Sequence, residues 1–361
     1  MIRKEKHIAI LCSRLDLPGG IERAIANTAN LLISKGKTVT LVILDETSSS
    51  FYPLHSDINI ICKSLHFGIT TKGNIVSRKL TFYNHVKALK ELLQNIGPDI
   101  IIATEYPFSI AAKLALRNNS TQIYSWEHHH YNHLQKSTFW RVLVKKLYPK
   151  LQGVICLNED EAKYFQRIGC KTFVIPNFIV SDNTEQATLE SKQLLTIGWL
   201  SKVKGADLIP KVASVVFAKH PDWKWRIIGD GEENESLQNA SANIEVIKPY
   251  SHNIVSEYLD SSLYVLSSRF ECFPMVLLEA MSVGLPAVAF DCPTGPKHII
   301  ENGIDGILIE KENVEAIAKA IIELIDDTEK RKQFGANAFQ NIQRFSADAV
   351  YPLWEQLLNA E

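Results

Sequence analysis

Residues 263–281, LYVLSSRFECFPMVLLEAM, change within one stretch from a strand pattern to a helix pattern. LYVLSS is a short apolar run typical of a buried strand, and the helix is expected to begin near Phe273 or Pro274. Glu271 then lies just before the helix and Glu279 more than a turn inside it. The unpaired N–H groups of a first helical turn, flanked by two carboxylates, suit a ligand, although an electrostatic cap and a solvent-facing acid fit the same stretch. The remainder of the chain decides between these interpretations.

The same alternation of strand and helix patterns runs through nearly the whole chain. Apolar runs such as HIAILCS, TVTLVIL and GVICL, and later QLLTIG, AVAF and GILI, are separated by segments with helical spacing. Buried strands that alternate with helices form parallel sheets with both faces covered. A chain of 361 residues is long enough for two such cores. The sequence therefore predicts an α/β protein with two Rossmann-like, doubly wound domains.

The domain boundaries follow from this pattern. The first domain is expected at residues 1–178 and the second at 179–345, and residues 346–361 read as a last helix. The polar stretch 181–193, SDNTEQATLESKQ, is the expected linker. In doubly wound sheets ligands bind beyond the carboxyl ends of the strands, so the loops that follow the strands are where functional residues are expected.

Composition favours the cytoplasm. Six cysteines are scattered without a CxxC pair, as buried free thiols of a reducing compartment would be. The start, MIRKEKHIAILCS, has the positive residues of a signal peptide, but its apolar part is shorter than a secretory core. No segment approaches the ~20 apolar residues of a membrane span. We therefore expect a protein that is neither exported nor transmembrane.

Charge is distributed unevenly between the two halves. Residues 1–180 carry 23 Lys and Arg against 13 Asp and Glu, whereas residues 181–361 carry 16 against 27. Within the first half, residues 135–150, QKSTFWRVLVKKLYPK, combine five basic residues with aromatic and aliphatic ones. That pattern is typical of a helix on an anionic membrane surface, and equally of a solvated face over a core stripe. Nucleic acid is not expected, because no recognition module accompanies the patch.

Two loops of the first half could carry chemistry. Gly19 and Gly20 precede a helix and would let its free N–H groups approach an anion, unless they form only a turn. The pattern is not GxGxxG, so a nicotinamide or flavin dinucleotide is poorly supported. The run EHHHYNH holds histidines 128, 129, 130 and 133, but consecutive residues rarely point at one centre. We therefore expect no metal site and favour His128, which lies nearest the strand end.

Loops of the second half are richer in ligand-binding residue types. GWLSKVKGAD places Lys202 and Lys204 ahead of a helix, with Gly198 leaving the strand, which suits a diphosphate. The next strand ends in IIGDGEE, which contains Gly231. The two remaining strand ends add Ser267, Ser268, Thr294 and Gly295.

Taken in order, these pieces resemble glycosyltransferase family 4, the retaining enzymes with the GT-B fold. The matching segments are PGGIER, VIPNF, GWLSKVKGAD, IIGDGEE, SRFECFPMVLLEAMSVGLPAVAFD and ENGIDGILI, and they cover most of the chain. The spacing of Glu271 and Glu279 is the most specific of them. The resemblance implies two Rossmann-like domains facing across a cleft, the first binding the acceptor and the second the nucleotide-sugar donor, with the last helix packing back on the first domain.

The resemblance also implies roles for individual residues. Glu279 would hold the ribose hydroxyls, and Glu271 the hydroxyls of the donor sugar. Lys204 would neutralise the diphosphate leaving group, His128 would lie near the transferred sugar, and Gly20 would approach the phosphates. Further donor contacts are expected from the loops and the helix start, namely Gly198, Lys202, Gly231, Cys272, Phe273, Pro274 and Met275. No metal is expected, because fixed cationic and N–H groups would meet the diphosphate.

The implied activity is retaining transfer of a hexose or N-acetylhexosamine, from a UDP-sugar, to a glycan or lipid-linked acceptor in polysaccharide or lipopolysaccharide assembly. Such an enzyme would work in the cytoplasm, peripherally on the inner face of the membrane. Three residues depart from the family pattern: Trp199 stands where an arginine is usual, and Cys272 and Pro274 stand where glycines are usual. A sugar-nucleotide epimerase with the same architecture and a non-catalytic nucleotide-sugar-binding protein are the alternative functions.

Overall fold

The computed structural model describes residues 6–67, 75–117, 119–129, 131, 136–180, 185–248 and 254–360. The chain forms two compact units. Unit 1 comprises Met1–Pro176 together with Tyr351–Glu361, and unit 2 comprises Asn177–Val350.

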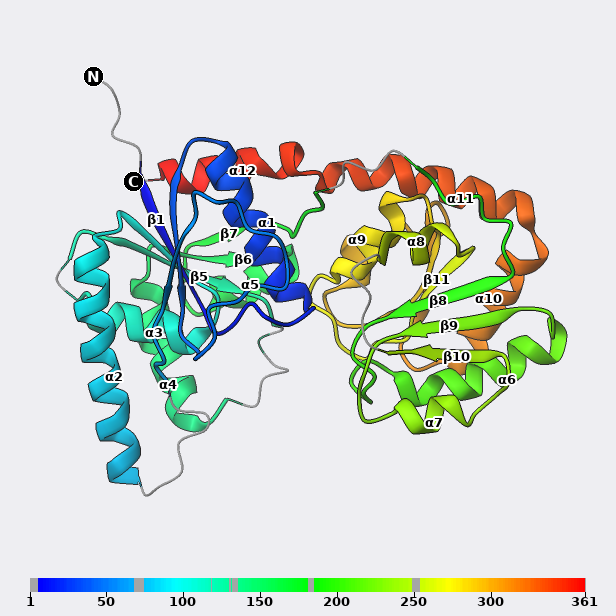
Figure 1. Ribbon diagram of the computed structural model, residues 1–361, viewed down its shortest axis with the longest axis horizontal. Helices are drawn as coiled ribbons and strands as arrows, with labels where there is room; N and C mark the ends of the chain where they lie inside the picture. The colour runs from blue at the N-terminus through cyan, green and yellow to red at the C-terminus, as the bar shows by residue number, and fades with distance from the viewer. Residues whose placement is uncertain are drawn as a thin grey trace. The chain divides into compact units, whose positions relative to one another are not determined.

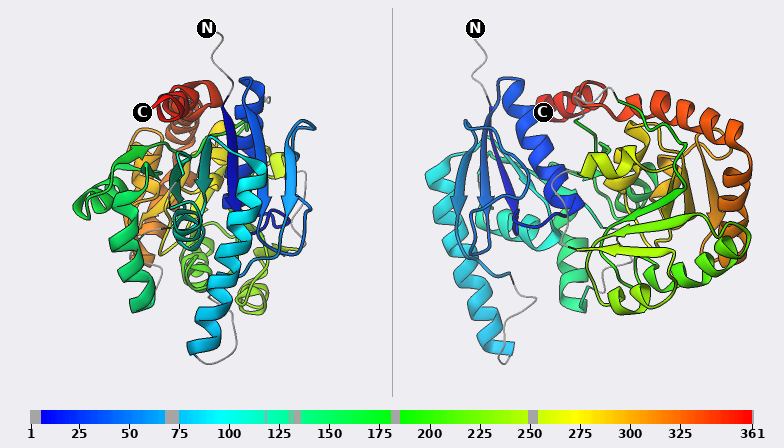
Figure 2. Two further views of the ribbon diagram at one scale, coloured as in Figure 1. Left: turned by 90° about the vertical axis from the view of Figure 1, so that its left-hand side faces the viewer. Right: turned by 45° about the vertical axis from the view of Figure 1, so that its right-hand side comes forward.

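Unit 1 is built on a seven-stranded parallel sheet with the order β3-β2-β1-β4-β5-β6-β7. The strands are β1 (His7–Cys12), β2 (Thr38–Ile43), β3 (Asn59–Cys62), β4 (Ile100–Ala103), β5 (Gln122–Glu127), β6 (Gly153–Cys156) and β7 (Thr172–Val174). The helices are α1 (Gly20–Ser34), α2 (Ile75–Ile96), α3 (Tyr106–Ala115), α4 (Thr138–Leu147) and α5 (Glu159–Arg167). Figures 1 and 2 show these helices around the sheet.

The central strands of unit 1 are apolar without interruption because helices cover both faces of the sheet. Ile8–Cys12 of β1 and all of β4 are buried. On one side α3 packs against β4, β5, α2 and α4. The last segment of the chain also belongs to this unit: Trp354 is 1% exposed and its ring lies 5.2 Å from that of Trp126.

Unit 2 repeats the arrangement with a six-stranded parallel sheet, in the order β10-β9-β8-β11-β12-β13. The strands are β8 (Gln193–Ile197), β9 (Lys224–Ile228), β10 (Ile244–Ile247), β11 (Leu263–Leu266), β12 (Ala287–Asp291) and β13 (Gly306–Glu310). The helices are α6 (Ile209–Lys219), α7 (Asn234–Gln238), α8 (Ile254–Leu259), α9 (Met275–Ser282), α10 (Val314–Asp326) and α11 (Thr328–Asn341), and α12 (Ala347–Asn359) follows. Helices α6 and α10 lie side by side on the sheet.

The two sheets share one topology. In each, strand order runs outward in one direction, returns to the first strand and continues in the other, so the prediction of two doubly wound domains is confirmed. The order reverses beside β1 in unit 1 and beside β8 in unit 2. In unit 2 the loops that follow β8 and β11 therefore emerge side by side, which is where such sheets bind ligands.

The polar stretch expected as a linker is already part of unit 2. The division between the units falls after Pro176. Residues 181–184 lie outside the described residues, but Ala187 N–H donates to the Val283 carbonyl at 2.8 Å, and Leu189 is 4% exposed. One apolar anchor thus docks an otherwise polar segment, which composition alone did not indicate.

Candidate donor site

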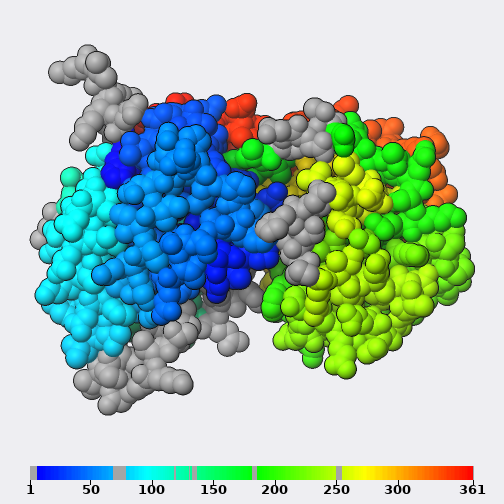
Figure 3. Space-filling model, in the orientation of Figure 1, coloured from blue at the N-terminus to red at the C-terminus, as the bar shows by residue number. Residues whose placement is uncertain are grey.

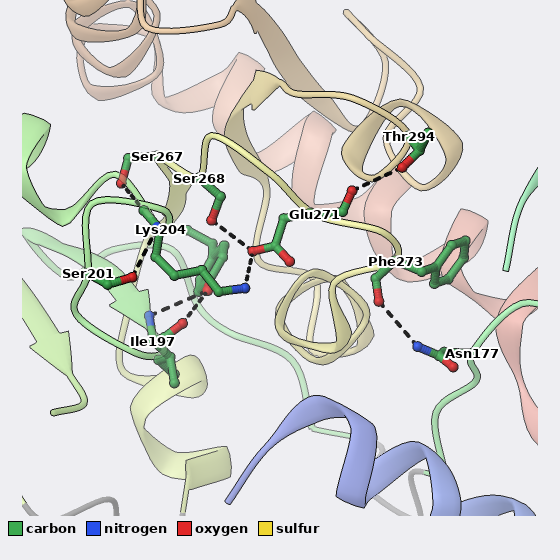
Figure 4. A network of polar contacts seen from close by, with 10 residues as sticks. Asn177, Ile197, Ser201, Lys204, Ser267, Ser268, Glu271, Phe273 and Thr294 are labelled. Carbon is green, nitrogen blue, oxygen red and sulfur yellow. Dashed lines mark hydrogen bonds and ion pairs between the residues drawn. The ribbon is translucent and has the colours of Figure 1, made fainter. Parts of the chain in front are cut away.

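The candidate site lies in unit 2, where the loops after β8 and β11 meet. Lys204 Nζ donates to Glu271 Oε1 at 2.8 Å, and Ser268 Oγ donates to the same oxygen at 2.8 Å (Figure 4). The Lys204 side chain is 39% exposed and that of Glu271 is 10% exposed. A solvent-accessible ammonium group therefore lies beside a largely buried, oriented carboxylate.

Backbone contacts fix Lys204 against the β11 loop. Ser267 Oγ donates to the Lys204 carbonyl at 3.2 Å, and Arg269 N–H donates to the Val203 carbonyl at 2.9 Å. Gly205 follows with φ of +68°, and a Cβ there would lie 1.8 Å from the Ser267 carbonyl oxygen. Only glycine permits both this left-handed conformation and this approach, so Gly205 is what allows the two loops to close together.

Glu279 lies inside helix α9. The helix begins at Met275 after Pro274, close to the expected start. Glu279 is 9% exposed, and one of its oxygens, Oε2, accepts a hydrogen bond from the Tyr258 hydroxyl at 2.8 Å. Tyr258 is 1% exposed, so a buried phenol on α8 sets the orientation of this carboxylate.

The segment after β12 covers the backbone of Glu271. Thr294 Oγ1 donates to the Glu271 carbonyl at 3.2 Å, and a Cβ on Gly295 would lie 2.6 Å from the Glu271 Cβ. Thr294 has φ of +70°, which is costly for a residue with a branched side chain. Nearby, burial and then the charge of Glu271 raise the pKa of Cys292 to about 12, so this thiol is not a nucleophile at neutral pH.

The other predicted donor residues of unit 2 lie around this core. Gly198 leaves β8, its N–H donating to the Ile228 carbonyl at 3.0 Å, and Lys202 is exposed on the same loop as Lys204. A Cβ on Gly231 would lie 2.3 Å from the Leu200 carbonyl oxygen, so this glycine also permits a close loop contact. The helix start is buried as a group, comprising Cys272, Phe273, Pro274 and Met275. The Phe273 carbonyl accepts a hydrogen bond from Asn177 Nδ2 at 3.2 Å (Figure 4).

His128 and Gly20, the remaining predicted site residues, belong to unit 1. Gly20 is the first residue of α1 and is exposed. His128 follows β5, is 7% exposed, and its ring lies 4.4 Å from that of Trp126. Burial, and secondarily the charge of His129, lower the pKa of His128 to about 3, so the imidazole is neutral in the folded protein. His130 and His133 lie outside the described residues.

No group of His, Cys, Asp or Glu among the described residues could hold a metal ion. The described helices include none with the length and apolar character needed to cross a bilayer.

Lys136 differs from its expected place on an exposed basic face. It is 8% exposed, and its Nζ lies 4.2 Å from the ring centroid of Tyr131 and 4.9 Å from that of Tyr106. Burial lowers the pKa of Lys136. Two aromatic faces thus attract the ammonium inward, a tertiary contact that helical spacing could not reveal. The exposed basic residues of this segment begin in α4, with Arg141, Lys145 and Lys146.

Sequence reasoning missed two residues that hold the site together. Tyr258 lies in a short helix that carries no recognisable motif. Arg269 lies between Ser268 and Glu271, but no role was predicted for it. The position of Arg269 inside the Glu271 segment was the one available signal for it.

Two family models together match most of the chain. Glycosyltransferase Family 4 matches residues 18–183, and Glycosyl transferases group 1 matches residues 180–341. The chain is 29% identical over 364 residues to an uncharacterized glycosyltransferase of Haemophilus influenzae, with 98% of this chain and 100% of that protein covered. It is 25% identical over 347 residues to a Campylobacter jejuni α-1,4-N-acetyl-D-galactosaminyltransferase named for a PP-undecaprenol-linked GalNAc glycan, with 94% and 95% covered.

Among solved structures, the fold is similar to that of a TarM variant of S. aureus in complex with fondaparinux, α-GlcNAc-glycerol and UDP. The TM-score is 0.80 at 18% identity, and the match covers 98% of this chain and 100% of that one. The likeness confirms the expected GT-B fold.

We expect Gly205→Ala to destabilise unit 2 through both backbone strain and the contact with Ser267. Gly303→Ala is the matched control, because Gly303 has φ of +80° but no atom within 4 Å of an added Cβ. Strain alone costs about 1 kcal/mol or more, and the Gly205 variant should exceed the control in urea denaturation. Equal losses for the two variants would contradict the close packing of the loops.

We expect His128 to make stability depend on acid pH. Its pKa is about 3 in the folded protein against 6.5 as the ordinary value, so below pH 6.5 only the unfolded chain takes up this proton. The free energy of unfolding then falls by about 1.4 kcal/mol per pH unit toward pH 3 from this group. His128→Gln should remove that slope in denaturation series, whereas His55→Gln, at an exposed histidine, should not. Superimposable slopes for all three proteins would show that His128 titrates normally.

Proposed function

Because the chain belongs to the family 4 type of glycosyltransferases with the GT-B fold, we propose that it transfers a hexose or N-acetylhexosamine from a nucleoside diphosphate sugar. The observation that carries this proposal is the pairing of Lys204 with Glu271 where the β8 and β11 loops meet, with Glu279 held on the adjoining helix. The family matches and the relatives support a glycosyltransferase of polysaccharide or cell-surface glycan biosynthesis.

The charges of the site suit the bond that breaks. The bond between the anomeric carbon and the diphosphate oxygen is cleaved, and its electron pair goes to the diphosphate. The acceptor hydroxyl oxygen bonds to the anomeric carbon, and its proton passes to the departing diphosphate. Negative charge therefore grows on the diphosphate, where an ammonium group stabilises the transition state more than the ground state. We assign this role to Lys204, with Lys202 as a second cation and no metal required.

The carboxylates suit the neutral parts of the donor. A carboxylate accepts hydrogen bonds from paired hydroxyls, so Glu279 would bind the ribose and Glu271 the transferred sugar. Hydrogen bonds from Ser268 and Lys204 already orient the Glu271 carboxylate. Gly198, Gly231 and the helix start from Cys272 to Met275 would complete the donor contacts. The roles of His128 and Gly20 rest on the family resemblance alone.

We infer UDP as the nucleotide and retention of the anomeric configuration. The TarM variant with a similar fold is in complex with UDP and α-GlcNAc-glycerol. The C. jejuni relative is named as an α-transferase for an undecaprenol-linked glycan. We therefore propose a lipid-linked or polymeric glycan as the acceptor.

A lipid-linked acceptor would place the enzyme at the inner face of the membrane, and unit 1 offers a surface for it. We call the exposed side chains of Leu80, Tyr83, Phe139, Val142, Lys145 and Lys146 the basic-aromatic surface. Leu80 and Tyr83 of α2 are 60% and 67% exposed, and Phe139 and Val142 of α4 are 50% and 48% exposed. Phe82 joins the two helices, its ring 6.4 Å from that of Phe139. Helix α2 forms an outer margin of unit 1 in Figure 3.

We expect Glu279→Ala to weaken UDP binding about 10-fold to 100-fold, as loss of hydrogen bonds to a charged group would do. Isothermal titration calorimetry measures this directly. Tyr258→Phe is the matched control, because it removes the orienting hydroxyl and leaves the carboxylate in place, so its loss should be smaller. Lys204→Met should lower kcat about 10²-fold to 10³-fold with a UDP-sugar. Unchanged UDP affinity in Glu279→Ala would place the nucleotide elsewhere.

Binding to vesicles tests the basic-aromatic surface. Reversing Lys145 and Lys146 to glutamate should lower affinity for vesicles of anionic lipid by at least about 30-fold, given about 1 kcal/mol per basic residue near such a surface. The same reversal at Lys330 and Lys332 of α11, in unit 2, is the control and should leave binding unchanged. Co-sedimentation decides, and equal effects of the two pairs would argue against a defined surface.

A further inference from the structure

Two arginine side chains of unit 2 make the same kind of contact, in which a guanidinium group donates two hydrogen bonds to a carboxylate on another element. Arg269 follows β11 and grips Asp207, with nitrogen–oxygen distances of 2.6 and 3.0 Å. Arg226 of β9 grips Glu257 of α8, with distances of 2.5 and 3.0 Å. Both arginine side chains are mostly buried, 19% and 26% exposed. The guanidinium group of Arg269 also donates to Glu312 and to the Lys202 carbonyl, and that of Arg226 also donates to Glu245.

Arg269 fastens the loop that carries the two lysines. Its side chain donates to Asp207 just after that loop, to the Lys202 carbonyl within it, and to Glu312 beyond β13. Its backbone N–H donates to the Val203 carbonyl at 2.9 Å. The loop is thus attached on both sides of Lys204, and Lys204 points at Glu271 as a consequence (Figure 4).

Arg226 fastens the helix that orients the other carboxylate. Besides Glu257, it donates to Glu245 of β10 at 3.0 Å, so it ties α8 to the sheet. The next residue of α8 is Tyr258, whose hydroxyl donates to Glu279 Oε2 at 2.8 Å. The Tyr258 ring also packs 6.0 Å from that of Tyr264, whose hydroxyl bonds the backbone of Ile197 at the end of β8. The position of α8 therefore sets the position of the Glu279 carboxylate.

Arginine suits this positioning role because its planar guanidinium group fixes both the distance and the direction of its hydrogen bonds to a carboxylate. A lysine ammonium group does not. The strongest effect on the Asp207 carboxyl is its hydrogen bond from Arg269, which lowers the pKa of Asp207. The contact with Glu257 is likewise the largest cause that raises the pKa of Arg226. Each of these two shifts favours the charged form of its group, so Asp207 and Arg226 are ionised at neutral pH.

We propose that Arg269 and Arg226 are separate positioning residues for the two halves of the nucleotide. Arg269 holds Lys204 where the diphosphate is met, and Arg226 holds Tyr258 and Glu279 where the ribose is met. This inference rests on the proposed function, since it takes Lys204 and Glu279 as the groups that bind the nucleotide. It assigns each arginine to a different part of the nucleotide.

The test compares three ligands on two variants, by calorimetry with competition against UDP for the weaker ones. Arg269→Met should weaken UDP and pyrophosphate by about tenfold and leave uridine within about twofold, since only a charge-assisted contact is misplaced. Arg226→Met should weaken UDP and uridine by a similar factor and leave pyrophosphate unchanged. A purely structural role would move the melting temperature and affect all three ligands alike.

Conservative variants sharpen the result. Arg269→Lys and Arg226→Lys keep the charge but lose the fork, so each should retain its own pattern of loss. Asp207→Asn should reproduce Arg269→Met, and the double variant should be no worse than either single one, because both changes break one contact. Lys192→Met removes an exposed ion pair with Asp222 at the opposite, amino end of β8 and should change no affinity. Melting curves of every variant confirm that unit 2 is folded.

The outcomes separate this inference from the proposed function. Suppose that Glu279→Ala and Lys204→Met weaken UDP binding, but that the arginine variants weaken the binding of all three ligands equally or of none. The separate roles of the two arginines are then wrong, and the proposed nucleotide site is retained. If UDP binds and none of the four variants weakens it, the nucleotide does not bind at this site, and both proposals fall.

Discussion

The structure of the site depends on one constraint, the close apposition of the β8 and β11 loops at the point where the strand order of unit 2 reverses. There a backbone approach that only Gly205 allows brings Ser267 and Arg269 onto the loop of Lys204. The ammonium of Lys204 and the carboxylate of Glu271 then meet at 2.8 Å. The parallel strands place both loops at one edge of the sheet. The sheet topology therefore determines that Lys204 and Glu271 can meet.

The ion pair itself contributes little to the stability of the fold. Lys204 is more than a third exposed, and partly exposed pairs stabilise proteins by about 1 kcal/mol or less. Its orientation is instead maintained by buried contacts around it: the Ser268 hydroxyl, the Thr294 hydroxyl on the Glu271 backbone, and the Arg269 fork. Lys204 can therefore exchange its contact with Glu271 for one with a diphosphate while the surrounding hydrogen bonds stay in place. Binding of a diphosphate at this site requires such an exchange.

Sequence reasoning named the residues of the candidate site that local patterns mark, and it did not name those that depend on packing. Lys204 and Glu271 lie in loops that follow strands, and Glu279 lies inside the helix that follows Glu271, where loop chemistry and helical spacing mark them. Tyr258 and Arg269 act through contacts between elements, which no spacing records. Lys136 shows the converse error, because a basic residue in an amphipathic pattern was drawn inward by two tyrosine rings. The two sheets were predictable since continuous apolar strands separated by helices allow few other arrangements.

The most direct test of the account is a crystal structure of the protein with UDP. We expect the ribose hydroxyls within hydrogen-bonding distance of Glu279 and a diphosphate oxygen at Lys204 Nζ. Glu271 should then face the space beyond the terminal phosphate. Density for UDP away from α9, or a nucleotide whose phosphates point away from the loop between β8 and α6, would contradict it.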